Sequence, residues 1–205
     1  MDKVDLSKLH KPLYATGKKA LEPHLVEVPP LNCLMIDGEG DPNTSAWFQE
    51  AMQALYTVAY TLKFDRKHRG MEPDYRVMPL EGLWRMADDS EFDPGIKSAW
   101  AWTMLIVQPD FITADEIVRA KEVAAAKKEV PRLDDLRLEV LKEGKAGQVL
   151  HLGPYAEEAP TIVRLHAYIA EQGFTLRGLH HEIYMSDPRR TAPEKLKTII
   201  RQPVE

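Results

Sequence analysis

A glutamate on a predicted strand near the C-terminus is the residue best placed to do chemistry. Glu182 is flanked at two-residue spacing by His180 and Tyr184. Side chains alternate between the two faces of a strand, so these three share one face with Leu176 and Gly178. That face is mixed in polarity and therefore meets either solvent or a functional cavity. Solvent is the usual surrounding of an isolated glutamate, because charged residues are mostly exposed.

The chemistry open to Glu182 depends on how deeply it is buried. A carboxylate among aromatic rings attracts a cationic or hydrogen-bonding ligand, or burial raises its pKa until it accepts a proton near neutral pH. Aromatic faces also bind cations and stack on planar ligands. Tyr155, Trp84 and Trp100 are candidate rings for such a site. Core packing is an equal alternative for each tryptophan, because large aromatic residues dominate protein cores.

Two further sets of polar residues have simpler interpretations. Glu81 lies on the corresponding strand of the first half of the chain. It could supply a second carboxylate or form a structural ion pair with Arg76 or Arg85, and the structural role is favoured. The adjacent His180 and His181 point to opposite faces of their strand, so they are poor ligands for one ion and no metal is expected.

Composition indicates a globular protein and excludes several functional classes. The chain has 205 residues, a formal net charge of −5 and 44% hydrophobic residues, so neither a nucleic-acid surface nor disorder is expected. Cys33 is the only cysteine, which excludes an internal disulfide. Residues 38–40 are not followed by the helix-opening glycine and the lysine of a nucleotide-binding loop, so no cofactor is expected. With no signal peptide and no run of about 20 apolar residues, the protein is expected to be cytoplasmic.

The pattern of apolar residues predicts the same order of elements twice: a strand pair, a helix and two further strands. An independent helix, with a capping box formed by Thr113 and Glu116, separates the halves. The first half has predicted strands at 25–28 and 31–36, a helix from Trp47 to about Phe64, and strands at 75–86 and 98–108. The second half has predicted strands at 136–140 and 148–152, a helix at 156–172, and strands at 174–185 and 196–202. The junction between two such units is a natural place for a cleft.

Four segments resemble the GyrI-like family, and the resemblance covers the chain from about Pro23 onward. The segments are Met78–Trp84, His151–Tyr155, Glu182–Arg190 and Lys195–Val204. The chain is similar to the stand-alone branch of the family, because no helix-turn-helix segment precedes the domain. The resemblance therefore argues against a DNA-reading regulator, and it favours a cavity over solvent around Glu182.

The resemblance implies an α+β fold of duplicated strand-helix-strand-strand (SHS2-type) units with pseudo-twofold symmetry, antiparallel sheets with helices, and a central ligand cleft. The expected division is an arm at 1–22 and a GyrI-like domain at 23–205, with repeats at about 23–108 and 132–205 and a connecting helix at about 113–129. Family members bind bulky, often aromatic or cationic small molecules. Some members that resemble this chain hydrolyse cyclopropane-bearing DNA-alkylating natural products, and one founding relative contacts DNA gyrase.

Two functions of different classes follow for Glu182. In a hydrolase, Glu182 would be the general base, Tyr155 or Tyr184 would donate a proton or hydrogen bond, and tryptophans would clamp a planar substrate. In a sequestering protein, the same cleft would hold a lipophilic aromatic or cationic compound, with Glu182 as its electrostatic anchor. Contact with gyrase is a third possibility. The residues expected to bind the ligand are Trp100, Tyr184, Glu81, Trp84 and His180. A monomer or homodimer without nucleic-acid or membrane partners is expected.

Overall fold

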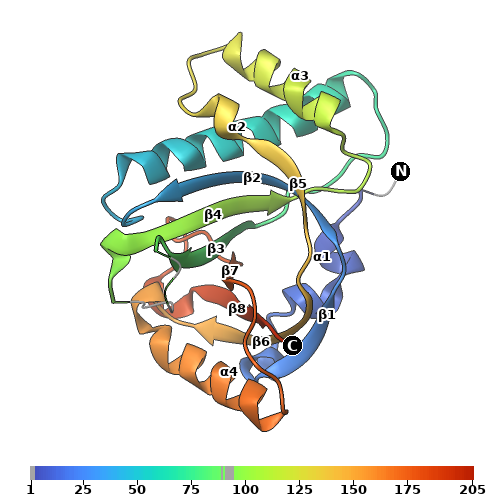
Figure 1. Cartoon of the computed structure of the whole chain (residues 1–205). Coiled ribbons are helices and arrows are strands. Elements are labelled where there is room, and N and C mark those ends of the chain that lie inside the picture. Colours follow the sequence, from blue (N-terminus) through green and yellow to red (C-terminus); the bar gives the residue numbers. More distant parts are fainter. Residues whose placement is uncertain (1–2, 89, 91–94) are drawn as a thin grey trace.

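One curled antiparallel sheet of eight strands forms the centre of the molecule (Figure 1). The computed structural model describes residues 3–88, 90 and 95–205. The strands are β1 (His24–Val28), β2 (Leu31–Glu39), β3 (Leu80–Met86), β4 (Trp100–Val107), β5 (Arg137–Leu141), β6 (Gly144–Leu152), β7 (His180–Tyr184) and β8 (Lys197–Pro203). The helices are α1 (Leu6–Leu9), α2 (Ala46–His68), α3 (Ala114–Ala125) and α4 (Ala159–Glu171), and a short 3₁₀ turn, η5 (Tyr155–Glu157), precedes α4. The predicted α+β class is confirmed.

The strands are arranged in the order β1-β6-β8-β7-β3-β4-β2-β5. β3 and β7 are paired at the centre of the sheet. Counted outward from this pair, β4 corresponds to β8, β2 to β6 and β5 to β1, so the two sides of the sheet carry equivalent strands of the two halves. β1 and β5 lie at the outer edges, where each pairs with a strand of the opposite half. Such an order suits a duplicated unit, and the duplication itself stays a prediction.

The first long helix, α2, covers the β2 and β4 end of the sheet (Figure 1). The hydroxyl of Ser45 caps it by accepting the backbone N–H of Phe48 at 3.3 Å. Leu55 and Val58, at the centre of its apolar stripe, are fully buried. Beneath the helix, a side chain at Gly38 would collide with the Trp102 ring, so the strand needs glycine there. The helix continues beyond its predicted end at Phe64.

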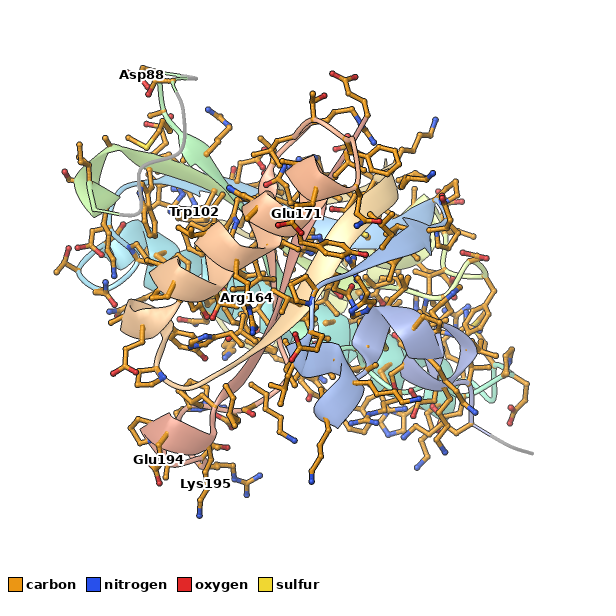
Figure 2. All side chains as sticks on the ribbon, turned by 90° about the horizontal axis from the view of Figure 1, so that it is seen from below. Asp88, Trp102, Arg164, Glu171, Glu194 and Lys195 are labelled. Carbon is orange, nitrogen blue, oxygen red and sulfur yellow. The ribbon has the colours of Figure 1, made fainter. Side chains whose placement is uncertain are left out.

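The other helices also follow from their sequences. α4 packs on β6 through Leu165 and Ile169, which lie directly against Gly147. Figure 2 views this helix from below, with Arg164 and Glu171 along it. The guanidinium of Arg164 donates to the carbonyl of Leu21 at 2.7 Å, which ties α4 to the N-terminal segment. α3 packs on α2 away from the sheet (Figure 1), and its predicted capping box is confirmed.

The N-terminal segment lies on the concave side of the curled sheet, whereas α2 and α4 lie on the convex side (Figure 1). It buries Leu6, Leu13, Tyr14 and Ala20. The central strands therefore meet the N-terminal segment on their concave face and lie between α2 and α4 on their convex face. The division of the chain into an arm and a domain stays a prediction.

The predicted strands at 75–86 and 174–185 begin well after their expected starts in the structure. β7 begins at His180 because Gly178 has a φ of 64°, a left-handed conformation that an extended strand does not have. β3 begins at Leu80, directly after Pro79, which has no backbone N–H to give to the ladder. The acidic run at 88–95, whose composition predicts a turn between the expected strands at 75–86 and 98–108, lies largely outside the described residues. Among the described residues, we find no helix with the length and apolar character needed to cross a membrane.

Candidate functional site

Glu182 lies at the centre of the convex face, on strands that neither long helix covers. In the β3–β7 ladder, Glu182 is opposite Gly82 and His180 is opposite Trp84. Aromatic side chains reach this point from both flanks. The Phe48 ring of α2 stacks on the Trp84 ring, with centroids 6.4 Å apart, and the Tyr155 ring of η5 meets the Tyr184 ring edge-on at 5.5 Å.

The carboxylate of Glu182 is held by a chain of hydrogen bonds. The Tyr184 hydroxyl donates to its Oε2 at 2.7 Å, and His180 Nε2 donates to its Oε1 at 3.1 Å. The Trp84 indole N–H donates to the Tyr184 oxygen at 3.2 Å. These bonds orient the carboxylate, and only 13% of the Glu182 side chain is exposed. The alternation predicted for this strand thus places His180, Glu182 and Tyr184 together.

A second carboxyl group, that of Glu158, lies close enough to Glu182 for each group to shift the pKa of the other. Glu158 follows η5, is 5% exposed, and has a pKa raised to about 9 by burial and by the Glu182 charge. Burial alone would also raise the pKa of Glu182, but the hydrogen bond and charge of His180, with the hydrogen bond from Tyr184 and the nearby Glu158 carboxyl, lower it. At neutral pH, Glu158 is therefore a protonated acid beside an ionised base. We call Glu158, Glu182, His180 and Tyr184 the outer cluster.

Aromatic rings form one wall beside the outer cluster. Trp84 meets Trp100 edge-on, with ring centroids 5.2 Å apart, and both rings are buried. The opposite side reaches solvent at Tyr155, which is 38% exposed. A bulky ligand therefore has to displace side chains, of which Tyr155 is the most exposed, to touch Glu182. Two surface hollows lie elsewhere, one of them beside Glu194 and Lys195 at the edge of the molecule (Figure 2).

Glu81 is the one predicted site residue that the structure does not bring to Glu182. Successive residues of β3 face opposite sides, so Gly82 faces the outer cluster and Glu81 faces the concave side. Glu81 is completely buried, where it accepts hydrogen bonds from the Tyr14 hydroxyl at 3.0 Å and from His181 Nε2 at 2.9 Å. The structural role favoured for Glu81 fits this position, but its partners are these two residues and not the predicted arginines.

His181 connects Glu81 to a second buried carboxylate. Its Nδ1 lies 2.9 Å from Glu143, and Arg201 binds the other oxygen of Glu143 at 3.1 Å. Burial opposes the charge on His181, but Glu143 and Glu81 raise its pKa to about 9. Burial likewise opposes the Glu143 charge, yet His181 and Arg201 hold the pKa of Glu143 at about 2. This group, the inner cluster, consists of Glu81, Glu143, His181 and Arg201.

Three residues near Glu182 are not predicted from the sequence: Glu158, Phe48 and Tyr56. Glu158 stands at the start of α4, where an acidic residue is ordinarily explained by the helix dipole. Phe48 belongs to the apolar stripe of α2, which predicts only a core position. Tyr56, about two turns of α2 beyond Phe48, contributes to raising the pKa of Tyr155 and so lies near it. In the described parts of the chain, no group of three or more His, Cys, Asp or Glu side chains could hold a metal ion.

Comparison with known proteins identifies the family. Residues 21–205 match the family described as GyrI-like small molecule binding domain. An uncharacterized conserved protein from Listeria innocua has 39% identity and a TM-score of 0.91, over 99% of this chain and 100% of that chain. A hydrolase from the same organism has 38% identity and a TM-score of 0.87, over 100% of each chain.

A more distant structure shares the fold alone. The EcmrR C-terminal domain has 16% identity and a TM-score of 0.60, over 90% of this chain and 97% of that chain. A comparison with curated proteins found no match. The match to the family over nearly the whole chain confirms the predicted resemblance, and the chain belongs to the GyrI-like small-molecule-binding family.

Proposed function

We propose that the protein binds a bulky aromatic or cationic small molecule beside Glu182 and hydrolyses a cyclopropane ring carried by such a compound. The observation that supports catalysis is the pair of neighbouring carboxyl groups whose pKa values are driven apart, Glu158 upward and Glu182 downward. A relative of 38% identity described as a hydrolase supports the same class. Opening a DNA-alkylating compound in this way would detoxify it.

The proposed reaction adds one water molecule to a cyclopropane conjugated to a dienone. Glu182 accepts a proton from the water as its oxygen bonds to a ring carbon. The strained carbon–carbon bond breaks, and its electron pair moves through the conjugated system to the carbonyl oxygen. Glu158 gives its proton to that oxygen, which leaves a neutral ring-opened alcohol. A proton then passes from Glu182 to the neighbouring Glu158, which restores both groups.

Glu158 is a better proton donor than the predicted tyrosines. The Tyr184 proton is already donated to Glu182, and burial raises the pKa of Tyr184 well above its usual value. Burial and the charges of Glu158 and Glu182 raise the pKa of Tyr155 to about 12, against about 9 for Glu158. Tyr155 is better placed to cover the bound substrate, because it lies between the outer cluster and solvent.

The test is to incubate the protein with a cyclopropane-bearing alkylator and follow the mass of the product. Glu182→Gln keeps the shape of the side chain but removes the base, so turnover should fall by about 10²- to 10⁴-fold while binding persists. Glu157→Gln is the matched control, because Glu157 is the exposed neighbour of Glu158 and should keep full turnover. Equal turnover in Glu182→Gln and the natural protein would refute the general-base role.

A second function, sequestration without chemistry, is favoured by one observation. Glu182 is ionised among the rings of Trp84, Tyr184 and Tyr155, which suits a lipophilic cation. In that case a phosphonium cation should bind tightly and Glu182→Gln should abolish its binding. The alkylator would then be recovered unchanged from the natural protein.

A further inference from the structure

An exposed row of aromatic side chains runs along α2 away from the outer cluster. Tyr56, Tyr60 and Phe64 follow one another at four-residue spacing, and 38%, 46% and 47% of their surfaces are exposed. Their rings are stacked in sequence, with centroids 6.5 Å and 6.4 Å apart and an angle of 23° between planes in both pairs. Three large apolar rings aligned in solvent form a patch that a folded protein seldom leaves without a use.

The row is continuous with the candidate site. Its earlier members at the same spacing are Phe48, whose ring stacks on Trp84, and the half-buried Met52. Four residues correspond to 400° of helix, so each member is rotated by about 40° from the previous one. The row therefore starts against the sheet beside the outer cluster and winds outward to Tyr56, Tyr60 and Phe64. Tyr56 is the member that lies near Tyr155, at the solvent side of the site.

We propose that Tyr56, Tyr60 and Phe64, which we call the α2 ladder, bind the distal part of an elongated planar aromatic ligand whose reactive end reaches Glu182. From Tyr56 to Phe64 the ladder spans about 12 Å along the helix, the length of several fused rings. Flat aromatic ligands stack on such rings, whereas short ligands would touch only the buried part of the site. This inference rests on the proposed function for the position of the reactive end and adds the shape of the preferred ligand.

The test compares two fluorescent probes of different length. The short probe is a single naphthalene carrying an ammonium group, and the long probe is a bis-benzimidazole dye. The double variant Tyr60→Ser and Phe64→Ser should weaken binding of the long probe by about tenfold or more and change binding of the short probe less than twofold. The control is Val163→Ser, at an exposed apolar position of α4, which should change neither.

Two results would refute the proposed ligand-binding role of the α2 ladder. One is equal affinity of the long probe for the natural protein and the double variant. The other is self-association of the natural protein that the double variant abolishes, measured by sedimentation, since the rings would then bind a second copy of the chain. Failure of the proposed hydrolysis is read separately, from product mass with Glu182→Gln, because the ladder variants leave Glu182 and Glu158 in place.

Discussion

Two groups of buried carboxylates lie on opposite faces of the same central strands, and they differ in charge balance. In the inner cluster, Glu81 and Glu143 face two cations, His181 and Arg201. The Tyr14 hydroxyl and the Leu13 carbonyl, both from the N-terminal segment, add hydrogen bonds to it. Every charge there has a partner of opposite sign, and no member is open to solvent.

The outer cluster brings Glu158 and Glu182 together on the other face, where His180 is hydrogen-bonded to Glu182. Because two carboxylates this close cannot both be ionised readily, one retains a proton. The difference shows how adjacent residues of one strand take separate roles. His181 completes a structural ion network, and Glu182 is left with a transferable proton beside it. Charge balance, more than burial, separates the structural cluster from the candidate catalytic one.

The largest expected effect comes from breaking the balance of the inner cluster. Arg201→Met leaves Glu143 with one cation fewer in a fully buried position, which should lower the free energy of unfolding by about 3–5 kcal/mol. Urea unfolding measures the change. Arg189→Met is the control, because Arg189 pairs with Asp187 on the surface and its loss should not be measurable. Equal stability of the two variants would show that the inner cluster is not a structural network.

Removing the proton donor of the outer cluster should have opposite effects on activity and stability. At pH 7, Glu158 is protonated in the folded chain but ionised in the unfolded chain, and this difference costs stability. Glu158→Gln should therefore raise the free energy of unfolding by about 1–3 kcal/mol. Its turnover of a cyclopropane substrate should fall about 10²-fold or more. A variant that loses stability together with turnover would assign Glu158 to the structure.

The free energy of unfolding should depend on pH through one titrating group in each cluster. His181 and Glu158 each have a folded pKa raised to about 9, from 6.5 and 4.5. The stabilisation linked to each proton is fully present below the unfolded pKa and is lost as pH rises through the folded pKa. Between pH 6.5 and 9 the folded chain therefore holds two extra protons, and stability should fall by about 1.4 kcal/mol per pH unit for each.

Variants separate the two contributions. The slope of unfolding free energy against pH, measured in urea between pH 7 and 8.5, should be about half as steep in Glu158→Gln as in the natural protein. His181→Gln should halve it as well, whatever its effect on stability at a single pH. An unchanged slope in Glu158→Gln would mean that Glu158 is ionised in the folded chain, which would refute the proposed acid–base pair of Glu158 and Glu182.

The sequence predicted one cluster well and the other poorly, for a physical reason. The period-two alternation of a strand is local, so it placed His180, Glu182 and Tyr184 together without knowledge of the fold. The partners of Glu81 and Glu182 come from distant segments: Tyr14 precedes the first strand, and Glu158 starts a helix. Such contacts depend on strand order, which apolar periodicity does not specify. Helix caps and the strand-helix-strand-strand order, in contrast, follow from neighbouring residues.

The smallest expected effect concerns the outer chain of hydrogen bonds. Trp84→Phe removes the indole N–H that donates to Tyr184, so the hydroxyl that orients Glu182 loses one anchor. Loss of one such bond is worth about 0.5–1.5 kcal/mol, and turnover should fall about two- to tenfold. Trp102→Phe is the matched control, because its indole N–H donates instead to the Gly40 carbonyl, away from Glu182. Both variants should lose stability, so only a fall in turnover specific to Trp84→Phe separates positioning of the base from packing of the wall.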